Sequence, residues 1–139
     1  MKRILVDTGP LVAILSSEDE HHALCVNLLR EMPGPLLSCW PVMTEAAWLL
    51  RKSPRAVQQL LRSLNGRFID LLPLAGAEAE GVAALMKRYE DMHPQLADVT
   101  LVYLANREKI ETIFTLDHRD FSIYRLRRRG TFRIVPEMG

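Results

Sequence analysis

The sequence predicts a layered α/β fold with a mostly parallel central sheet. Two observations lead to this prediction: short aliphatic runs with the character of buried strands, and amphipathic helical patterns that alternate with them. The runs "RILVD" and "TIFTLD" each end on an aspartate and have the composition of strands buried on both faces of a parallel sheet. Because parallel neighbours need crossover helices, the alternation of the two patterns fits this class.

The other elements follow in order along the chain. Strands are also predicted at "PLLSC", "FIDLLPL" and the final "FRIVP". The acidic start "SEDE" opens one helix, Asn65 and Gly66 end another, and "MHP" separates the last two long ones. Helices are therefore predicted over residues 17–32, 41–51, 54–64, 76–91 and 96–109, with a further helix before the last strand.

Length and composition limit the classes of protein to consider. A chain of 139 residues, 48% of them hydrophobic, predicts one globular domain over residues 1–139. A net charge of +1 provides no general basic field, so a nucleic-acid surface would need local clustering. Apolar stretches fall short of the roughly 20 residues of a membrane helix, and "MKR" leads into a strand pattern. We expect a cytoplasmic protein with no membrane partner.

Cysteine and tryptophan are assigned structural roles. Cys25 and Cys39 have no CxxC spacing and few histidines nearby, so both are predicted to be buried thiols. Trp40 and Trp48 lie in apolar surroundings without interleaved basic residues. They are interpreted as anchors of the core or of a dimer face rather than as platforms for base stacking.

Four acidic residues stand out by their position. Asp7 and Asp117 each follow an apolar strand directly, at the strand end where ligands gather in open parallel sheets. Glu45 and Asp98 have apolar neighbours one helical turn away, and burying an unpaired carboxylate is costly. Each has a simpler explanation alone: a turn or cap residue for Asp7, a helix cap for Asp98, and a polar residue on a helix flank for Glu45.

Taken together, the four acids predict a metal site. Carboxylate oxygens without a Cys/His cluster suit a hard divalent ion such as Mg²⁺ or Mn²⁺ and argue against zinc. With a phosphodiester as substrate, such an ion can activate a water and stabilise charge on the attacking and leaving oxygens. The predicted chemistry is phosphodiester hydrolysis.

The chain also resembles a known family, the PIN-domain ribonucleases, in particular the small VapC-like toxins of toxin–antitoxin modules. The segments that carry the resemblance are "ILVDTGPLVAIL", "TEAAWLL", "YEDMHPQLADVTLVYLA" and "IFTLDHRDF". The resemblance implies a three-layer α/β/α sandwich, usually dimeric, with an acidic cleft that faces RNA. It implies that Asp7, Glu45, Asp98 and Asp117 are the catalytic metal ligands and that Thr8, Thr115 and Asp120 support them.

The resulting hypothesis is a Mg²⁺- or Mn²⁺-dependent endoribonuclease that acts as a toxin and is silenced by a cognate antitoxin. One alternative is a PIN domain that binds RNA or protein without cleaving it. Another is a phosphatase with Asp7 as nucleophile, which would need a second acid two positions on, where the chain has Gly9. The intact set of four acids favours the nuclease.

Two surfaces are assigned provisional partners. Arg119, Arg125, Arg127, Arg128 and Arg129 are candidates for RNA phosphate contacts, although a solvated connector explains the cluster equally well. The helix with Leu24 and Leu28 could offer an apolar groove to an antitoxin helix, although any core-facing helix shows the same pattern.

Overall fold

The computed structural model describes residues 2–64, 68–127 and 130–137. Its centre is a five-stranded sheet with strand order β3-β2-β1-β4-β7, and every pair of neighbouring strands is parallel. The predicted parallel sheet is therefore confirmed. The strands are β1 (Ile4–Val6), β2 (Leu36–Ser38), β3 (Ile69–Leu71), β4 (Thr112–Phe114) and β7 (Arg133–Val135).

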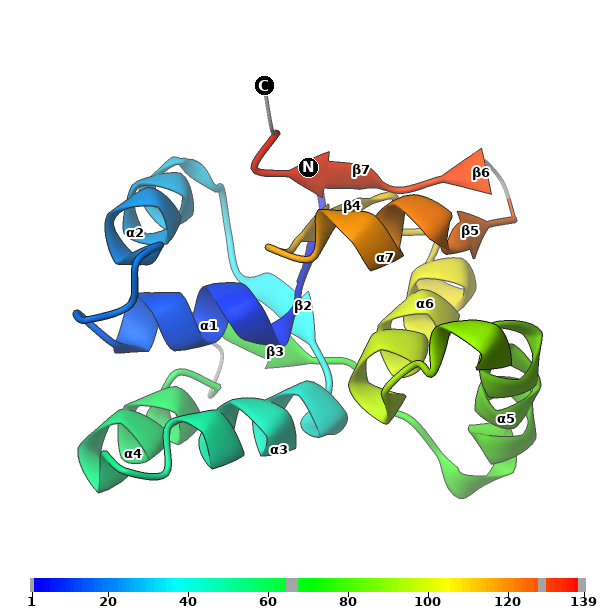
Figure 1. Ribbon diagram of the computed structural model, residues 1–139, viewed down its shortest axis with the longest axis horizontal. Helices are drawn as coiled ribbons and strands as arrows, with labels where there is room; N and C mark the ends of the chain where they lie inside the picture. Colours follow the sequence, from blue (N-terminus) through cyan, green and yellow to red (C-terminus); the bar gives the residue numbers. More distant parts are fainter. Residues whose placement is uncertain (1, 65–67, 128–129, 138–139) are drawn as a thin grey trace.

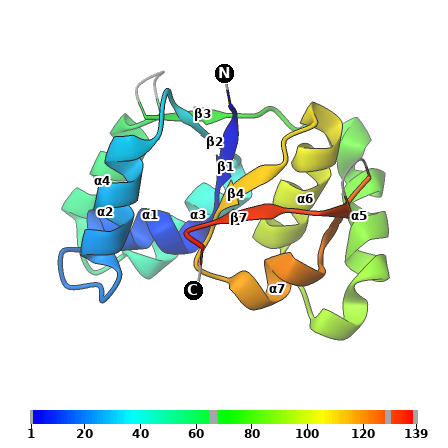
Figure 2. The same ribbon diagram turned by 90° about the horizontal axis from the view of Figure 1, so that it is seen from above.

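Helices cover both faces of this sheet and give the predicted three layers (Figures 1 and 2). On one side lie α1 (Thr8–Leu15), α2 (His22–Glu31) and α4 (Pro54–Arg62). On the other side lie α5 (Ala79–Arg88), α6 (Leu96–Glu108) and α7 (His118–Ile123). The helix α3 (Trp40–Leu49) contacts both α1 and α6 and so joins the two sides.

The central strands and α6 form the core. All residues of β1, β2 and β4 are buried, in agreement with the aliphatic runs that predicted them. In register, Leu5 of β1 lies between Leu37 of β2 and Ile113 of β4. The helix α6 is buried around most of its circumference from Ala97 to Ala105, which explains why its sequence shows no clear polar face. Burial of these apolar side chains is the main stabilising contribution to the sandwich.

Two helix starts differ from the prediction. No helix was predicted between Asp7 and residue 17, but α1 begins at Thr8 and Pro10 occupies its first turn, where proline is tolerated. The helix predicted over residues 17–32 begins only at His22. The acidic residues before it form turns, in which Asp19 Oδ1 accepts a 2.8 Å hydrogen bond from the backbone amide of His21.

Further differences concern the second half of the chain. The helix predicted over residues 76–91 is divided into a 3₁₀ turn η1 (Gly76–Glu78), the helix α5 and a second turn η2 (Glu90–Met92). The arginine-rich segment, for which RNA contact and a solvated connector were equally weighted, includes the antiparallel pair β5 (Arg125–Leu126) and β6 (Gly130–Thr131). The predicted stop at Asn65 and Gly66 lies outside the described residues.

The structural roles assigned to cysteine and tryptophan are only partly correct. Cys25 and Cys39 are buried free thiols, as predicted, and burial raises their pKa to about 11 and about 12. Trp40 and Trp48 are not in the core, since 59% and 63% of their surfaces are exposed. No helix in the described part of the chain is long and apolar enough to cross a bilayer.

Candidate metal centre

Asp7 lies where β1 ends and α1 begins. Its backbone amide donates a 2.9 Å hydrogen bond to the carbonyl of Phe114, which fixes it to the end of β4. Its Oδ2 accepts a 2.8 Å bond from the Thr115 hydroxyl, while the buried Oδ1 has no partner in the described part of the chain. Burial raises the pKa of Asp7 to about 6, against the opposing effect of hydrogen bonds from the Thr8 amide and Thr115.

Asp117 and Asp120 belong to the start of α7. Asp117 is the N-cap residue, and its Oδ1 accepts a 3.0 Å bond from the backbone amide of Asp120. The amide of Asp117 in turn donates a 3.0 Å bond to Thr115 Oγ1. The Thr115 hydroxyl therefore connects Asp7 with the backbone that carries Asp117. Burial and the neighbouring Asp117 raise the pKa of Asp120.

Asp98 and Glu45 approach from two other helices. Asp98 lies in the first turn of α6, and burial raises its pKa to about 7. The negative charges of Asp7, Asp117, Glu45 and Asp120 act in the same direction. Glu45 is half-buried on α3, and its charge also contributes to the raised pKa of Asp7. The site thus concentrates negative charge, and none of the ion pairs among the described residues involves these acids.

All five acids line one pocket of about 420 Å³ at the carboxyl ends of the strands. The oxygens of Asp98, Asp117 and Asp120 lie within 4.8 Å of one another, close enough to share one ion. Asp7 and Glu45 line the same pocket but fall outside this group of three. The unpartnered buried oxygen of Asp7 and the raised pKa values fit an all-oxygen site for a hard divalent cation.

The structure brings the supporting residue Thr8 to this pocket but leaves the predicted RNA-binding arginines that it describes away from the lining. Thr8 lines it and is buried, with a hydroxyl that has no partner among the described residues. Arg119 is exposed on α7, and Arg125 and Arg127 are exposed around β5, away from the lining of the acidic pocket. Arg128 and Arg129 lie outside the described residues.

Three residues near the site were not singled out from the sequence. His93 and Gln95, which precede α6, line the pocket. Tyr124 is fully buried after α7, its hydroxyl has no described partner, and burial together with the acids raises its pKa. The spacing of four residues between Asp120 and Tyr124, one helical turn, was the available signal.

The parallel sandwich with clustered acids at its strand ends defines the class as an α/β domain with a candidate all-oxygen metal site, and the comparisons identify the family. The PIN domain model matches residues 4–127, so the chain belongs to the PIN-domain family. It is 30% identical over 135 residues to Ribonuclease VapC26 of Mycobacterium tuberculosis, covering 96% of this chain and 100% of that protein.

The fold is also found in a solved structure. The crystal structure of Mycobacterium tuberculosis VapC20, described as a Sarcin-Ricin loop cleaving toxin, superposes with a TM-score of 0.68. The match covers 79% of this chain and 86% of that chain at 18% sequence identity. The resemblance stated from the sequence motifs is thus confirmed at the level of family and fold.

Proposed function

We propose that the protein is a metal-dependent endoribonuclease of the VapC type, the toxin of a toxin–antitoxin pair. The observation that carries this proposal is the convergence of five carboxylates, from four separate parts of the chain, on one pocket. The similarity to Ribonuclease VapC26 along nearly the whole chain supports RNA as the substrate. An RNA substrate would be met in the cytoplasm, the location we propose.

Asp7, Glu45, Asp98 and Asp117 are the proposed ligands of Mg²⁺ or Mn²⁺, and the position of Asp120 adds it to this set. A bound divalent ion supplies positive charge for the phosphodiester and lowers the pKa of a water nucleophile. The chain holds its ligands in place through Thr115, whose hydroxyl orients Asp7. The amide of Asp117 orients that hydroxyl.

Two surfaces support the proposed protein partners. An apolar cavity of about 440 Å³ lies between α1, α2, α4 and the strands β2 and β3, and is proposed to receive an antitoxin helix. Its wall on α2 is Leu29, whereas Leu24 and Leu28 are outside the lining. The exposed Trp40 and Trp48 on α3 are the proposed anchors of a homodimer face.

The proposal is tested by incubating the purified protein with mixed RNA in Mg²⁺ or Mn²⁺. Asp98→Asn and Glu45→Gln should each lower the cleavage rate about 100-fold or more, because each removes a charged ligand. Glu31→Gln, an exposed acid at the end of α2, is the matched control and should cleave normally. Circular dichroism establishes that each variant is folded.

The outcomes separate the alternatives. Cleavage that persists in both acid variants would contradict the roles assigned to these residues. RNA binding without cleavage in either metal would favour a binding-only PIN domain. In cells, expression of the wild type should arrest growth, whereas expression of Asp98→Asn should not. If the wild type does not affect growth, the toxin assignment is refuted but the nuclease assignment is not.

A further inference from the structure

We propose that a second pocket, lined by three arginines, binds a backbone phosphate of the RNA that enters the acidic pocket. This arginine pocket has a volume of about 220 Å³ and lies between α5, α6 and the strand β5. The inference rests on the proposed function, since the phosphate belongs to the RNA substrate. The lining consists of Gly81, Ala84, Leu85, Arg88, Tyr103, Asn106, Arg125, Leu126 and Arg127.

The charge of this pocket is entirely positive. Arg88 comes from the end of α5, and Arg125 and Arg127 come from β5 and the residue after it. Its lining, as far as the structure describes it, contains no aspartate or glutamate. Within the described ranges, none of the three guanidinium groups forms an ion pair with a carboxylate. In a chain with a net charge of only +1, this is a local concentration of unneutralised charge.

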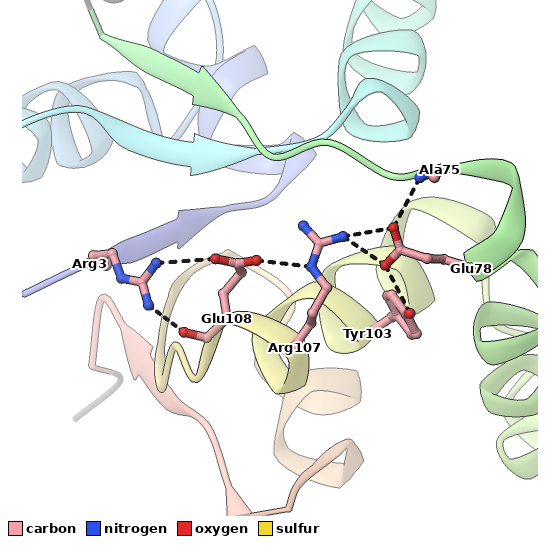
Figure 3. Close-up of polar contacts among 6 residues, drawn as sticks. All are labelled: Arg3, Ala75, Glu78, Tyr103, Arg107 and Glu108. Atoms are coloured by element: carbon pink, nitrogen blue, oxygen red, sulfur yellow. Dashed lines mark hydrogen bonds and ion pairs between the residues drawn. The ribbon is translucent and has the colours of Figure 1, made fainter.

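The neighbouring Arg107, unlike the three pocket arginines, forms ion pairs with two glutamates (Figure 3). Its Nη1 lies 2.8 Å from Glu78 Oε2, and its Nε lies 2.9 Å from Glu108 Oε2. Glu108 also bonds Arg3, and Glu78 accepts a 2.9 Å bond from the Tyr103 hydroxyl. Arg107 holds the pKa of Glu78 at about 2, so this carboxylate is ionised and already engaged.

The same network shapes the arginine pocket. Tyr103 lines the pocket, and its hydroxyl is held by Glu78, so the ring is a fixed wall. Gly81 faces this ring, and a Cβ atom at position 81 would lie only 2.6 Å from Tyr103 Cε1. The helices α5 and α6 therefore approach each other closely at this point. The arginine pocket lies beside this contact.

Arg125 is positioned before any ligand arrives. Its Nη1 donates hydrogen bonds of 2.7 Å and 2.8 Å to the carbonyls of Ser122 and Ile123 at the end of α7. Its Nη2 and Nε make no bond to any residue that the structure describes. A guanidinium held in this way loses less rotational freedom when it binds an anion, and its free edge suits the paired oxygens of a phosphate.

The position of the pocket points to RNA rather than to an acidic protein. The helix α7 begins directly after Asp117 in the acidic pocket and ends just before Tyr124 and Arg125. Its six residues span about 9 Å at roughly 1.5 Å per residue. Successive phosphates of a nucleic-acid strand lie only a few ångströms apart, so a short segment of RNA is long enough to reach from one end of this helix to the other. A stable protein partner would need a far larger interface than this pocket offers.

The test compares RNA binding by Arg88→Ala and Arg127→Ala with binding by the wild type. Neither side chain makes a hydrogen bond to a described residue or lines the acidic pocket, so both variants should fold. Arg55→Ala on α4, at an exposed position outside both pockets, removes the same charge and is the matched control. Arg125 is left intact because it caps α7.

Affinity for a fluorescein-labelled single-stranded RNA is measured by anisotropy in EDTA, which prevents metal-dependent cleavage, over a series of KCl concentrations. We expect each pocket variant to bind about tenfold more weakly, as for the loss of one charged hydrogen bond. The slope of log K against log salt should fall by about 0.7 for each lost phosphate contact. Arg55→Ala should match the wild type.

Each result either supports or overturns the proposal. Pocket variants that bind like the wild type, an equal loss in Arg55→Ala, or a wild type that binds no RNA would overturn it. Pocket variants that bind RNA normally but no longer bind a co-expressed antitoxin would also overturn the proposal, because the pocket would then be a site for protein. A weakened affinity in a protein that cleaves no RNA would support the pocket and refute the nuclease. A wild type that cleaves RNA, together with pocket variants of unchanged RNA affinity, would support the nuclease and refute the pocket.

Discussion

The hydroxyl of Thr115 donates a 2.8 Å hydrogen bond to Oδ2 of Asp7, joining residues that are 108 positions apart in the sequence. The same hydroxyl oxygen accepts a 3.0 Å bond from the amide of Asp117. One buried side chain at the end of β4 thus sets both the carboxylate at the end of β1 and the start of α7. Outer partners of this kind orient metal ligands and raise their affinity.

Replacing Thr115 should therefore weaken metal binding without removing a ligand. Thr115→Val keeps the shape but loses the hydroxyl, so the pKa of Asp7 should rise further and Mn²⁺ affinity should fall about 10- to 100-fold. Thr115→Ser restores the hydroxyl and should recover most of the affinity. Titration of Mn²⁺ by electron paramagnetic resonance measures both, and equal affinity in the valine and wild-type proteins would contradict the role of Thr115.

The metal-free protein should lose stability as the pH rises. Folding raises the pKa of Asp7 to about 6 and of Asp98 to about 7, so between about pH 4 and 7 the folded state holds more protons than the unfolded state. The free energy of unfolding must then fall with increasing pH across this window. Urea denaturation in EDTA at the two ends of the window measures the difference.

Asp98→Asn should remove much of this pH dependence. At a pH above 7 the variant should be more stable than the metal-free wild type, by an amount on the order of a few kcal/mol, because it no longer confines a charge. The exposed Glu31→Gln should show the wild-type profile. A wild type whose stability increases steadily from pH 4 to 7 would show that these carboxyls are not under electrostatic strain.

Metal binding should release protons near neutral pH. Because a ligand must be ionised to bind, protons compete with the metal at Asp7 and Asp98 as the pH falls below about 7. Mg²⁺ affinity should therefore decrease toward pH 5.5, and the heat of binding should depend on the ionisation enthalpy of the buffer. Isothermal titration calorimetry in two buffers tests this, and heats that are identical in both would contradict it.

Gly81→Ala should destabilise the contact between α5 and α6. The added Cβ would lie 2.6 Å from the ring of Tyr103, which Glu78 holds in place, and such overpacking costs about 1–3 kcal/mol. Gly76→Ala, whose Cβ would meet nothing within 4 Å, is the control. Thermal unfolding compares the two, and Tyr103→Phe should reduce the penalty at position 81. Equal melting temperatures for the two glycine variants would contradict this account.

The sheet could be predicted from the sequence because its strands are buried on both faces, so their aliphatic runs are unbroken. The helix α1 was missed for a related reason: "TGPLVAIL" is almost wholly apolar and shows no helical period, and its Gly-Pro pair is typical of a turn. The start of α2 was predicted too early because the acidic residues 18–20 have the composition of a helix start, whereas in the structure they form turns in which Asp19 accepts a hydrogen bond from the His21 amide.

The four acids and their convergence on one site were predictable, but the closest group within the site was not. Position at strand ends and apolar neighbours identified Asp7, Asp117, Glu45 and Asp98, and all four line one pocket. That Asp120 joins Asp98 and Asp117 in the closest group depends on the short helix α7, which turns its carboxylate back toward α6. Likewise Arg88 is far from Arg125 in the chain, and only the packing of α5 beside β5 reveals that they share a pocket.

The positions along the chain of the residues that form the acidic pocket have a consequence for biosynthesis. Its first carboxylate is at position 7 and its last is at position 120. A nascent polypeptide that ends before residue 112 has β1 but neither β4 nor α7 to set beside it. Products of translation interrupted before α7 is made therefore lack a complete centre, and the N-terminal aspartate waits for its partners until more than a hundred further residues have been added.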